Sequence, residues 1–293
     1  MFFGSSAFAV PSLSATARDH DVIAVFTQAD RPAGRGMKLR PTPVKSAATE
    51  AGLPVFEPQR LDAAFVAGIA ALAPQALTCV SYGKILPASL LATPSLGALN
   101  VHPSMLPAYR GAAPIQAALR DGCTRTGVSV IWMSKRMDAG DIALAREVDI
   151  APGDDFGSLH DRLAAIGAEL LAEALAQLAL GTLARTPQDE SRATFIKPIS
   201  KEDQHLRLDD AQQALNIVRS LSPRPGAWLE LGGKRVKVLE ARAEPGGGEP
   251  GALASLDDDG PLIACRSGAL RLLRVVPEGR PPMSGADFAR SLR

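Results

Sequence analysis

Asn100 and His102 stand one residue apart near the end of a short apolar run, residues 98–102. The run is predicted to form a β-strand, and side chains two positions apart on a strand point to the same side. In an open α/β sheet, ligands bind beyond the carboxyl ends of the strands, which is where this pair falls. We therefore expect an amide and an imidazole to face a ligand together.

A carboxylate for this pair can come from the loop after the next predicted strand, residues 127–133. The loop contains Asp138 and Asp141, with Gly140 between them. A loop with a glycine can turn back toward the histidine. On proximity alone, either aspartate could supply the carboxylate.

A histidine with an amide on one side and a carboxylate on the other suits acyl transfer. The amide and a protonated imidazole can donate hydrogen bonds to a developing oxyanion, and the carboxylate favours the imidazolium. An acceptor amine brings its own lone pair, so no serine or cysteine nucleophile is required. A histidine at a strand end is more often structural than catalytic, and His20, His160 and His205 are given the structural role.

The elements that position these residues alternate between short β-rich runs and helical patterns. Thr42 followed by Pro43 is typical of a helix start, because threonine caps the first turn and proline fits its first position. Strands are predicted over residues 21–27, 76–82, 98–102 and 127–133, and helices over 43–51, 112–120 and 158–180. This alternation predicts an α/β fold with an open, parallel-rich sheet flanked by helices.

The pattern changes near residue 186. Residues 186–206 are polar and are predicted to link a catalytic domain at 1–185 to a second domain at 207–293. In the second domain a helix is predicted over 210–221, and strands over 227–231, 235–241, 262–265 and 270–276. Short strands separated by turn residues predict a small β-barrel.

Length and composition fit a two-domain globular protein. The chain has 293 residues, of which 46% are hydrophobic and 22% charged. Its three cysteines lack CxxC pairing and a nearby histidine at ligand spacing, which argues against a disulfide framework or a zinc site. There is no apolar run of the ~20 residues that a membrane helix needs and no secretory signal, so we expect a cytoplasmic protein without a membrane partner.

Local charge, rather than the net charge of +1, points to nucleic acid. Between residues 30 and 45 one acidic residue faces five basic ones, which are Arg31, Arg35, Lys38, Arg40 and Lys45. Interleaved glycine and proline predict a mobile arm rather than a helix face, and such arms contact phosphate backbones. Residues 207–293 carry 13 basic against 11 acidic residues, so a basic surface there would have to be one-sided.

Several stretches together resemble a known family. Asn-Val-His-Pro-Ser-Met-Leu-Pro at 100–107, Arg-Gly at 110–111 and Met-Asp-Ala-Gly-Asp at 137–141 resemble the signature of folate-dependent formyltransferases. Residues 26–36, Phe-Thr-Gln-Ala-Asp-Arg-Pro-Ala-Gly-Arg-Gly, and 222–228, Ser-Pro-Arg-Pro-Gly-Ala-Trp, are similar to motifs of the methionyl-tRNA branch of that family. The similarity covers almost the whole chain.

The resemblance implies roles for particular positions. Asn100, His102 and Asp138 match the family's catalytic trio, which favours Asp138 over Asp141. The folate-binding stretch is matched by Ser104, Met105, Leu106 and Pro107, and the methionine replaces the usual leucine at similar volume. The positions that would contact tRNA are Arg31, Arg35, Lys38 and Arg40, with Arg35 reaching the acceptor end.

The resemblance also implies a fold and a reaction. The fold would be a Rossmann-like formyltransferase domain followed by a C-terminal OB-like barrel that binds tRNA. The donor would be a reduced folate, 10-formyltetrahydrofolate, and the acceptor the amino group of charged initiator methionyl-tRNA, giving N-formylmethionyl-tRNA for translation initiation. No metal would take part, and the protein is expected to be a monomer.

Other functions remain as alternatives. A folate formyltransferase acting on a nucleotide or an amino sugar would share the trio but would not need the basic residues between 31 and 45. A nucleotide-binding oxidoreductase is disfavoured, because the turn at Gly4 lacks the three-glycine dinucleotide fingerprint. A non-catalytic tRNA-binding protein is disfavoured by the intact trio.

The chain begins close to its first turn. Only Met1, Phe2 and Phe3 precede Gly4, whereas a typical strand has about 5–6 residues. In the resembled fold the first strand lies inside the sheet. We therefore expect a stunted central strand, and a natural reading frame that starts further upstream.

Overall fold

The computed structural model describes residues 1–33 and 38–292. Arg35 lies outside the described residues, and of Lys38 only the backbone is described. The chain forms two compact units, and each is built from several segments of sequence. The first unit comprises Met1–Gly111, Thr126–Val148 and His160–Phe195, and the second comprises Ala112–Arg125, Asp149–Leu159 and Ile196–Arg293.

The first unit is organised around a seven-stranded sheet in the order β10-β9-β7-β6-β1-β2-β5. These strands are β1 (Phe2–Gly4), β2 (Val25–Phe26), β5 (Val55–Phe56), β6 (Ala76–Val80), β7 (Gly97–His102), β9 (Arg125–Trp132) and β10 (Ile142–Asp149). Pairing is parallel from β7 through β6, β1 and β2 to β5, whereas β9 runs antiparallel to β7. The predicted parallel-rich α/β sheet is confirmed, with an antiparallel strand beside the site strand β7.

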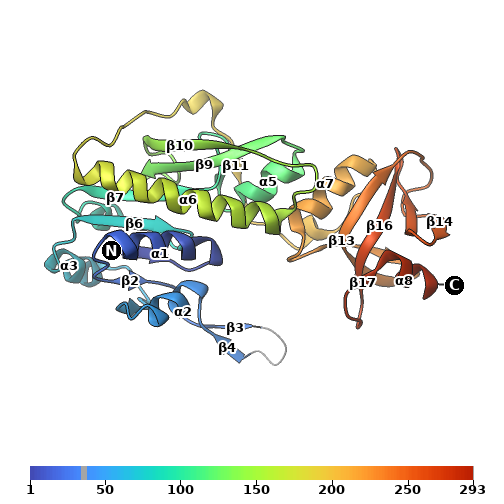
Figure 1. Ribbon diagram of the computed structural model, residues 1–293, viewed down its shortest axis with the longest axis horizontal. Coiled ribbons are helices and arrows are strands. Elements are labelled where there is room, and N and C mark those ends of the chain that lie inside the picture. Colours follow the sequence, from blue (N-terminus) through green and yellow to red (C-terminus); the bar gives the residue numbers. More distant parts are fainter. Residues whose placement is uncertain (34–37, 293) are drawn as a thin grey trace. The chain divides into compact units, whose positions relative to one another are not determined.

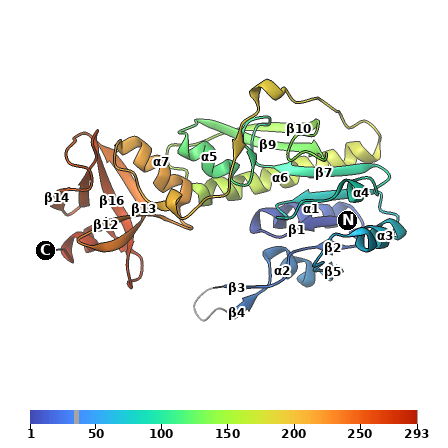
Figure 2. The same ribbon diagram turned by 180° about the vertical axis from the view of Figure 1, so that it is seen from behind.

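Helices cover both faces of this sheet. They are α1 (Val10–Asp19, preceded by η1, Ala7–Ala9), α2 (Pro43–Glu50), α3 (Ala63–Ala71), α4 (Ala88–Leu91) and α6 (Phe156–Ala179). Figures 1 and 2 show α1 and α6 on one face. There α6 approaches β7 so closely that a Cβ at Gly167 would lie 2.9 Å from Val101 Cγ1. On the other face Phe3, Leu77 and Ala98 share an apolar cluster with residues of α3 and α4.

The predicted strand and helix positions are largely confirmed. The strands expected at 76–82, 98–102 and 127–133 are β6, β7 and β9, and the one expected at 21–27 is shortened to β2. The helix predicted from residue 43 is α2, and the Thr42 side chain caps it by accepting a hydrogen bond from the backbone N–H of Lys45 at 3.0 Å. A local signal suffices here because capping involves residues only three positions apart.

The basic stretch contains two short strands. A mobile arm rather than a helix face was predicted between residues 30 and 45, and its described parts before α2 form an antiparallel hairpin of β3 (Arg31–Ala33) and β4 (Lys38–Arg40). The mobility of this arm stays a prediction. Lys45 does not belong to the hairpin, since it lies in α2 and its ammonium group pairs with Asp30 at 2.8 Å and with Glu57. Its charge is therefore neutralised locally and is not available to a phosphate.

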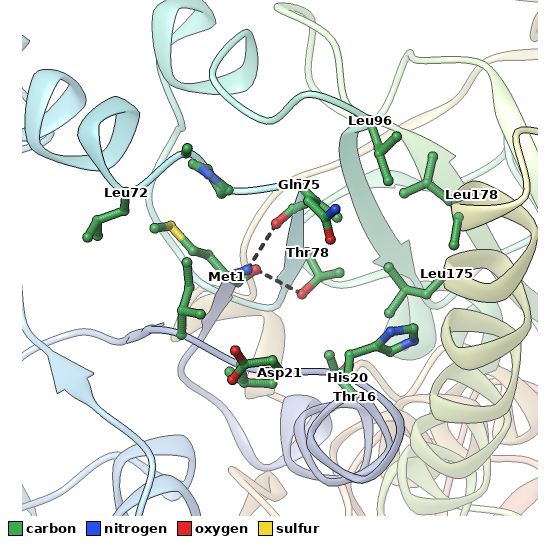
Figure 3. Close-up of a pocket in the computed structure, with 16 residues that line it drawn as sticks. Met1, Thr16, His20, Asp21, Leu72, Gln75, Thr78, Leu96, Leu175 and Leu178 are labelled. Carbon is green, nitrogen blue, oxygen red and sulfur yellow. Dashed lines mark hydrogen bonds between the residues drawn. The ribbon is translucent and has the colours of Figure 1, made fainter.

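Strand β1 lies at the centre of the sheet with only three residues. Met1 extends the pairing with β6 beyond the amino end of β1, because its amino group donates to Ala76 O at 2.9 Å and its carbonyl oxygen accepts from the N–H of Thr78. A cavity of about 350 Å³ lies at this amino edge, lined by residues such as Met1, His20, Asp21, Leu175 and Leu178 (Figure 3). The stunted strand is confirmed, while an upstream start stays a prediction.

The second unit contains an antiparallel sheet in the order β12-β13-β16-β15-β14, with β17 paired to β16. Its elements are α5 (Pro114–Arg120), α7 (Ala211–Leu221), β12 (Ala227–Leu231), β13 (Lys234–Glu244), β14 (Leu253–Asp257), β15 (Gly260–Ala264), β16 (Ala269–Pro277), β17 (Met283–Ser284) and α8 (Gly285–Arg290). Leu221, Val238 and Leu272 belong to its buried core. The expected OB-like antiparallel domain is present. Among the described residues, no pairing between the edge strands β12 and β14 closes the sheet into a barrel.

The polar segment 186–206 contains short ordered elements. These are η2 (Glu190–Arg192), β11 (Phe195–Ile196) and η3 (Glu202–Gln204), and β11 pairs with β8 (Arg110–Gly111). The domain boundaries at 185 and 206 stay a prediction. No helix among the described residues is both long and apolar enough to span a bilayer.

Candidate active site

His102 is the last residue of β7 and is buried, with 4% of its surface exposed. Its Nε2 atom lies 2.9 Å from the carbonyl oxygen of Tyr109. A carbonyl oxygen can only accept, so Nε2 carries a proton and donates it to Tyr109. The tautomer is thereby fixed, and Nδ1 is left as the ring nitrogen that can gain and lose a proton.

Asp138 faces that second nitrogen. Its Oδ2 atom lies 3.7 Å from His102 Nδ1 and accepts a hydrogen bond from the backbone N–H of Gly111 at 2.9 Å. Asp141, the other aspartate of the loop, contributes its backbone carbonyl to the N–H of Trp132 at 2.9 Å. The tertiary structure thus brings Asp138, as the resemblance implied, to the histidine.

The loop that carries Asp138 turns back through an unusual backbone. Asp138 has φ of +50°, a left-handed conformation that costs a non-glycine residue energy. Gly140 has no room for a side chain, because a Cβ would collide with the carbonyl of Trp132. The carbonyl oxygens of Asp138 and Gly140 both accept hydrogen bonds from Gln188 Nε2, at 2.8 and 2.7 Å.

Asn100 lies two residues before His102 on β7 and is half-buried. Within the described part of the chain, its side-chain amide has no hydrogen-bond partner. A half-buried amide with free N–H groups, on the strand face it shares with the histidine, can donate to an oxyanion at no cost to another contact.

The predicted folate-binding stretch forms a tight loop directly after β7. Ser104 is fully buried, and its hydroxyl donates to Ala108 O at 2.7 Å. Leu106 is also buried and its N–H donates to Ser129 Oγ, while Met105 and Pro107 are half-buried. The Ser104 hydroxyl proton is donated to Ala108 O, so this side chain holds the loop in shape, while the Met105 side chain lies against Gly127 of β9.

A cysteine lies on the strand next to β7. Cys79 lies at the position on β6 paired with Asn100, and burial raises the pKa of its thiol to about 12. It is therefore a neutral thiol at physiological pH, as expected of a buried small hydrophobe. No group of three or more metal-binding side chains occurs among the residues that the structure describes.

Of the predicted tRNA-binding residues, Arg31 belongs to β3 and Arg40 to β4, and Arg35 lies outside the described residues. Arg31 and Arg40 are exposed, and Arg31 donates a hydrogen bond to Gln28 Oε1. Arg40 has no ion-pair partner among the described residues. Lys38 belongs to β4.

Several residues around the trio were missed by sequence reasoning. Tyr109 and Gly111 act through backbone atoms, which their side-chain identities do not reveal. Gln188 lies in the segment expected to be a polar linker, 50 positions from Asp138. Of these residues, only Gly111 could have been found from the sequence, because Arg110-Gly111 is part of the family motif quoted above.

Comparison with known protein families covers both halves of the chain. Residues 2–175 match the family model described as formyl transferase. Residues 198–293 match the model described as formyl transferase, C-terminal domain. The first match contains Asn100, His102 and Asp138.

Solved structures of similar fold include formyltransferases that act on different acceptors. An N-formyltransferase from Helicobacter canadensis, solved with folinic acid and dTDP-3-aminofucose, aligns with a TM-score of 0.69 at 14% identity, covering 92% of this chain and 97% of that one. Methionyl-tRNA formyltransferase from Clostridium thermocellum aligns with a TM-score of 0.56 at 14% identity, over 82% of this chain and 91% of that one. At these identities the likeness supports the fold.

Closer relatives decide the family. Methionyl-tRNA formyltransferase of Methylobacterium sp. is 45% identical over 302 residues, covering 100% of this chain and 96% of the relative. Those of Geobacter metallireducens and Thermus thermophilus are 42% and 41% identical, covering 100% and 99% of this chain and 95% and 94% of theirs. With both domain models matched and identity of this level over the full length, the chain belongs to the methionyl-tRNA formyltransferase family of formyl transferases.

Proposed function

We propose that this enzyme transfers the formyl group of 10-formyltetrahydrofolate to the amino group of methionyl-initiator tRNA. The observation that carries the proposal is the state of His102. Its Nε2 proton is committed to Tyr109 O, its Nδ1 faces Asp138, and the free amide of Asn100 lies on the same strand face. A formyl transfer to an amine needs a proton acceptor, a counter-charge and an oxyanion donor, and these three groups supply them.

The residues act in a defined order. The neutral amine attacks the formyl carbon, a carbon–nitrogen bond forms, and the carbonyl oxygen becomes an oxyanion to which Asn100 donates. His102 Nδ1 takes the proton released by the amine, and Asp138 stabilises the resulting imidazolium. The bond between the formyl carbon and the folate nitrogen N10 then breaks. That nitrogen receives the proton from Nδ1, leaving tetrahydrofolate and the N-formylated product.

Support for a folate donor comes from the family and from the loop after β7. A structural neighbour, HypX from Aquifex aeolicus, was solved in complex with tetrahydrofolic acid and has a TM-score of 0.64 at 19% identity. In this chain Pro107 is half-buried and offers apolar surface to a flat ring, whereas the Met105 side chain lies against Gly127 of β9. We propose that Ser104 and Leu106 act indirectly, by holding this loop in place.

Support for a tRNA acceptor comes from the relatives' names and from the hairpin. Arg31 and Arg40 are exposed on β3 and β4, with no carboxylate against either among the described residues. We propose that the basic stretch 31–40, which includes β3 and β4, contacts the phosphate backbone of tRNA, with Arg35 and Lys38 taking part. Arg35→Ala should lower activity on charged tRNA while folate binding is retained, and a parallel loss of both would refute this role.

The decisive experiment supplies the acceptors side by side. Purified enzyme is incubated with 10-formyltetrahydrofolate and either methionyl-initiator tRNA, a 3-amino sugar nucleotide or an aminoacylated elongator tRNA. We expect formylation of methionyl-initiator tRNA, measured by mass spectrometry of the released amino acid. Efficient formylation of the amino sugar instead would refute the proposed acceptor.

We further propose that the enzyme works in the cytoplasm, where charged initiator tRNA is used, and that it acts as a monomer. The trio and its supporting residues all come from one compact unit of one chain. The oligomeric state is tested by light scattering at working concentration. A stable dimer would refute this part of the proposal and leave the reaction unaffected.

A further inference from the structure

Gln188 makes four hydrogen bonds that join two parts of the active site. Its Nε2 group donates to the carbonyl oxygens of Asp138 and Gly140, at 2.8 and 2.7 Å. Its Oε1 atom accepts from Nε and Nη2 of Arg110, at 3.2 and 2.7 Å. Both hydrogens of the amide nitrogen and both lone pairs of the amide oxygen are therefore engaged, which fixes the orientation of the side chain.

Arg110 gives this glutamine a rigid support. The Arg110 side chain is fully buried, and its guanidinium also makes a two-pronged ion pair with Glu190, at 3.2 and 2.9 Å. Arg136 binds the same carboxylate at 2.6 Å. A planar guanidinium held by two acceptors cannot rotate without breaking several charge-assisted bonds, so Gln188 is anchored on a fixed group.

The Asp138 loop needs such an anchor. Asp138 adopts a left-handed backbone conformation that persists only where neighbouring contacts hold it. Two kinds of contact do so: Gly111 holds the carboxylate, and Gln188 holds the backbone on both sides of Ala139. Without the second, the carboxylate would no longer be aimed at His102 Nδ1.

We propose that Gln188 is a positioning residue of the formyl transfer, which fixes Asp138 against His102 through the buried Arg110. This inference rests on the proposed catalytic role of Asp138. Gln188 itself touches neither reacting group, so its effect should fall on turnover and spare the binding of both substrates.

The test uses an exchange that keeps the size of the side chain and replaces the amide donor by a carboxylate oxygen. Gln188→Glu keeps the size of the side chain and can still accept from Arg110, but it cannot donate to the two carbonyls. We expect kcat to fall by about 10–100-fold, as for a small misplacement of a catalytic group. KM for 10-formyltetrahydrofolate and for methionyl-tRNA should stay within about threefold. Gln177→Glu is the matched control, because Gln177 is a glutamine of α6 that donates to Glu173 far from the trio, and its kcat should not change.

Each other outcome has a defined meaning. Equal kcat in Gln188→Glu and Gln177→Glu would overturn the assignment, as would a rise in KM without a fall in kcat. If Gln188→Glu does not fold, Gln188→Met takes its place, since it has similar length and brings no charge near the carbonyls. Failure of both to fold would make Gln188 a structural residue and refute the inference. Asp138→Asn is measured alongside: full activity there would refute the proposed catalytic role, whereas an inactive Asp138→Asn with normal Gln188→Glu would refute only the positioning role.

Discussion

Each unit of the molecule contains a buried arginine that forms ion pairs with carboxylates. We call each arginine with its carboxylates a clamp, and the two clamps have different roles. Arg110 in the first unit is 1% exposed and Arg271 in the second is 7% exposed. Arg110 pairs with Glu190, while Arg271 pairs with Glu244 at 3.0 Å and Asp257 at 2.7 Å. A buried cation requires such partners, so burial by itself does not distinguish the two sites.

The difference lies in what the remaining donors hold. Arg271 binds Gly260 O at 2.8 Å in addition to its carboxylates, and all these groups belong to β13, β14 and β15 of one sheet. Arg110 instead donates its other hydrogen bonds to Gln188. Gln188 in turn donates to the backbone of the loop that carries Asp138. The same chemistry therefore fixes strands in one unit and aims a carboxylate in the other.

The largest expected effect on turnover comes from substituting His102 or Asp138, the two side chains that the contacts of Arg110 and Gln188 position. His102→Ala and Asp138→Asn should each reduce kcat by about 10²–10⁴-fold, the range for a positioned acid–base group. Folate binding should change much less, since neither side chain belongs to the loop after β7. Turnover of the purified variants under saturating substrates is the measurement.

Asp141→Asn is the matched control for this prediction. Asp141 lies in the same loop, but its backbone carbonyl is the group bound to Trp132. We expect a much milder effect. Near-normal turnover in His102→Ala or Asp138→Asn would contradict the assignment of the trio.

The next prediction compares the effects of replacing each buried arginine on stability and on kcat. Arg271→Met removes the buried cation that pairs with Glu244, and the exposed Arg242 stays as its other partner. Removing the arginine leaves the largely buried Glu244 carboxylate without its interior partner, which destabilises the folded state. The midpoint of urea denaturation should fall, while kcat at 25 °C stays within about threefold.

Arg110→Met should show the opposite balance. Its main effect is a loss of kcat of about tenfold or more, because Gln188 loses its support. Comparable loss of kcat in both methionine variants would erase the functional difference between the two clamps.

A third prediction concerns acid. Hydrogen bonds from Arg110 and Arg136 lower the pKa of Glu190 from its ordinary value of 4.5 to about 2. A lowered folded-state pKa stabilises the folded protein above the ordinary value, and this contribution disappears as pH falls from about 4.5 to 2. The stability difference between the unsubstituted protein and Glu190→Gln should therefore be constant above pH 5 and shrink on acidification.

The Arg271 clamp provides the comparison for this titration. Its arginine likewise lowers the pKa values of Glu244 and Asp257. Glu244→Gln should show the same shrinking difference, in stability alone, whereas Glu190→Gln should also lower kcat at neutral pH. A stability difference for Glu190→Gln that does not vary between pH 5 and pH 2 would contradict the prediction.

The smallest effect is expected at an arginine without a clamp. Arg40 is exposed on β4 and has no ion-pair partner in the described part of the chain. Arg40→Ala should raise KM for methionyl-tRNA a few-fold and lower the slope of its salt dependence by about one. Stability and folate KM should be unchanged. A fall in kcat without a change in the salt slope would contradict a phosphate contact.

Local sequence patterns determined much of the fold and half of the site. The Thr42 cap and the strand β7 were predictable, because capping and side-chain alternation involve residues two or three positions apart. The shared face of Asn100 and His102 follows from the same alternation. The basic hairpin was less predictable, since pairing of β3 with β4 depends on register rather than on composition.

Only the tertiary structure decided how the trio is assembled. Spacing left Asp138 and Asp141 equivalent, and the choice between them depends on a left-handed backbone and on the N–H of Gly111. The support from Gln188 joins positions 50 residues apart, and its contact with Arg110 joins positions 78 residues apart. Hydrogen bonds between distant segments leave no periodic pattern in a single sequence, because any polar residue in a loop can make them once the chain has folded.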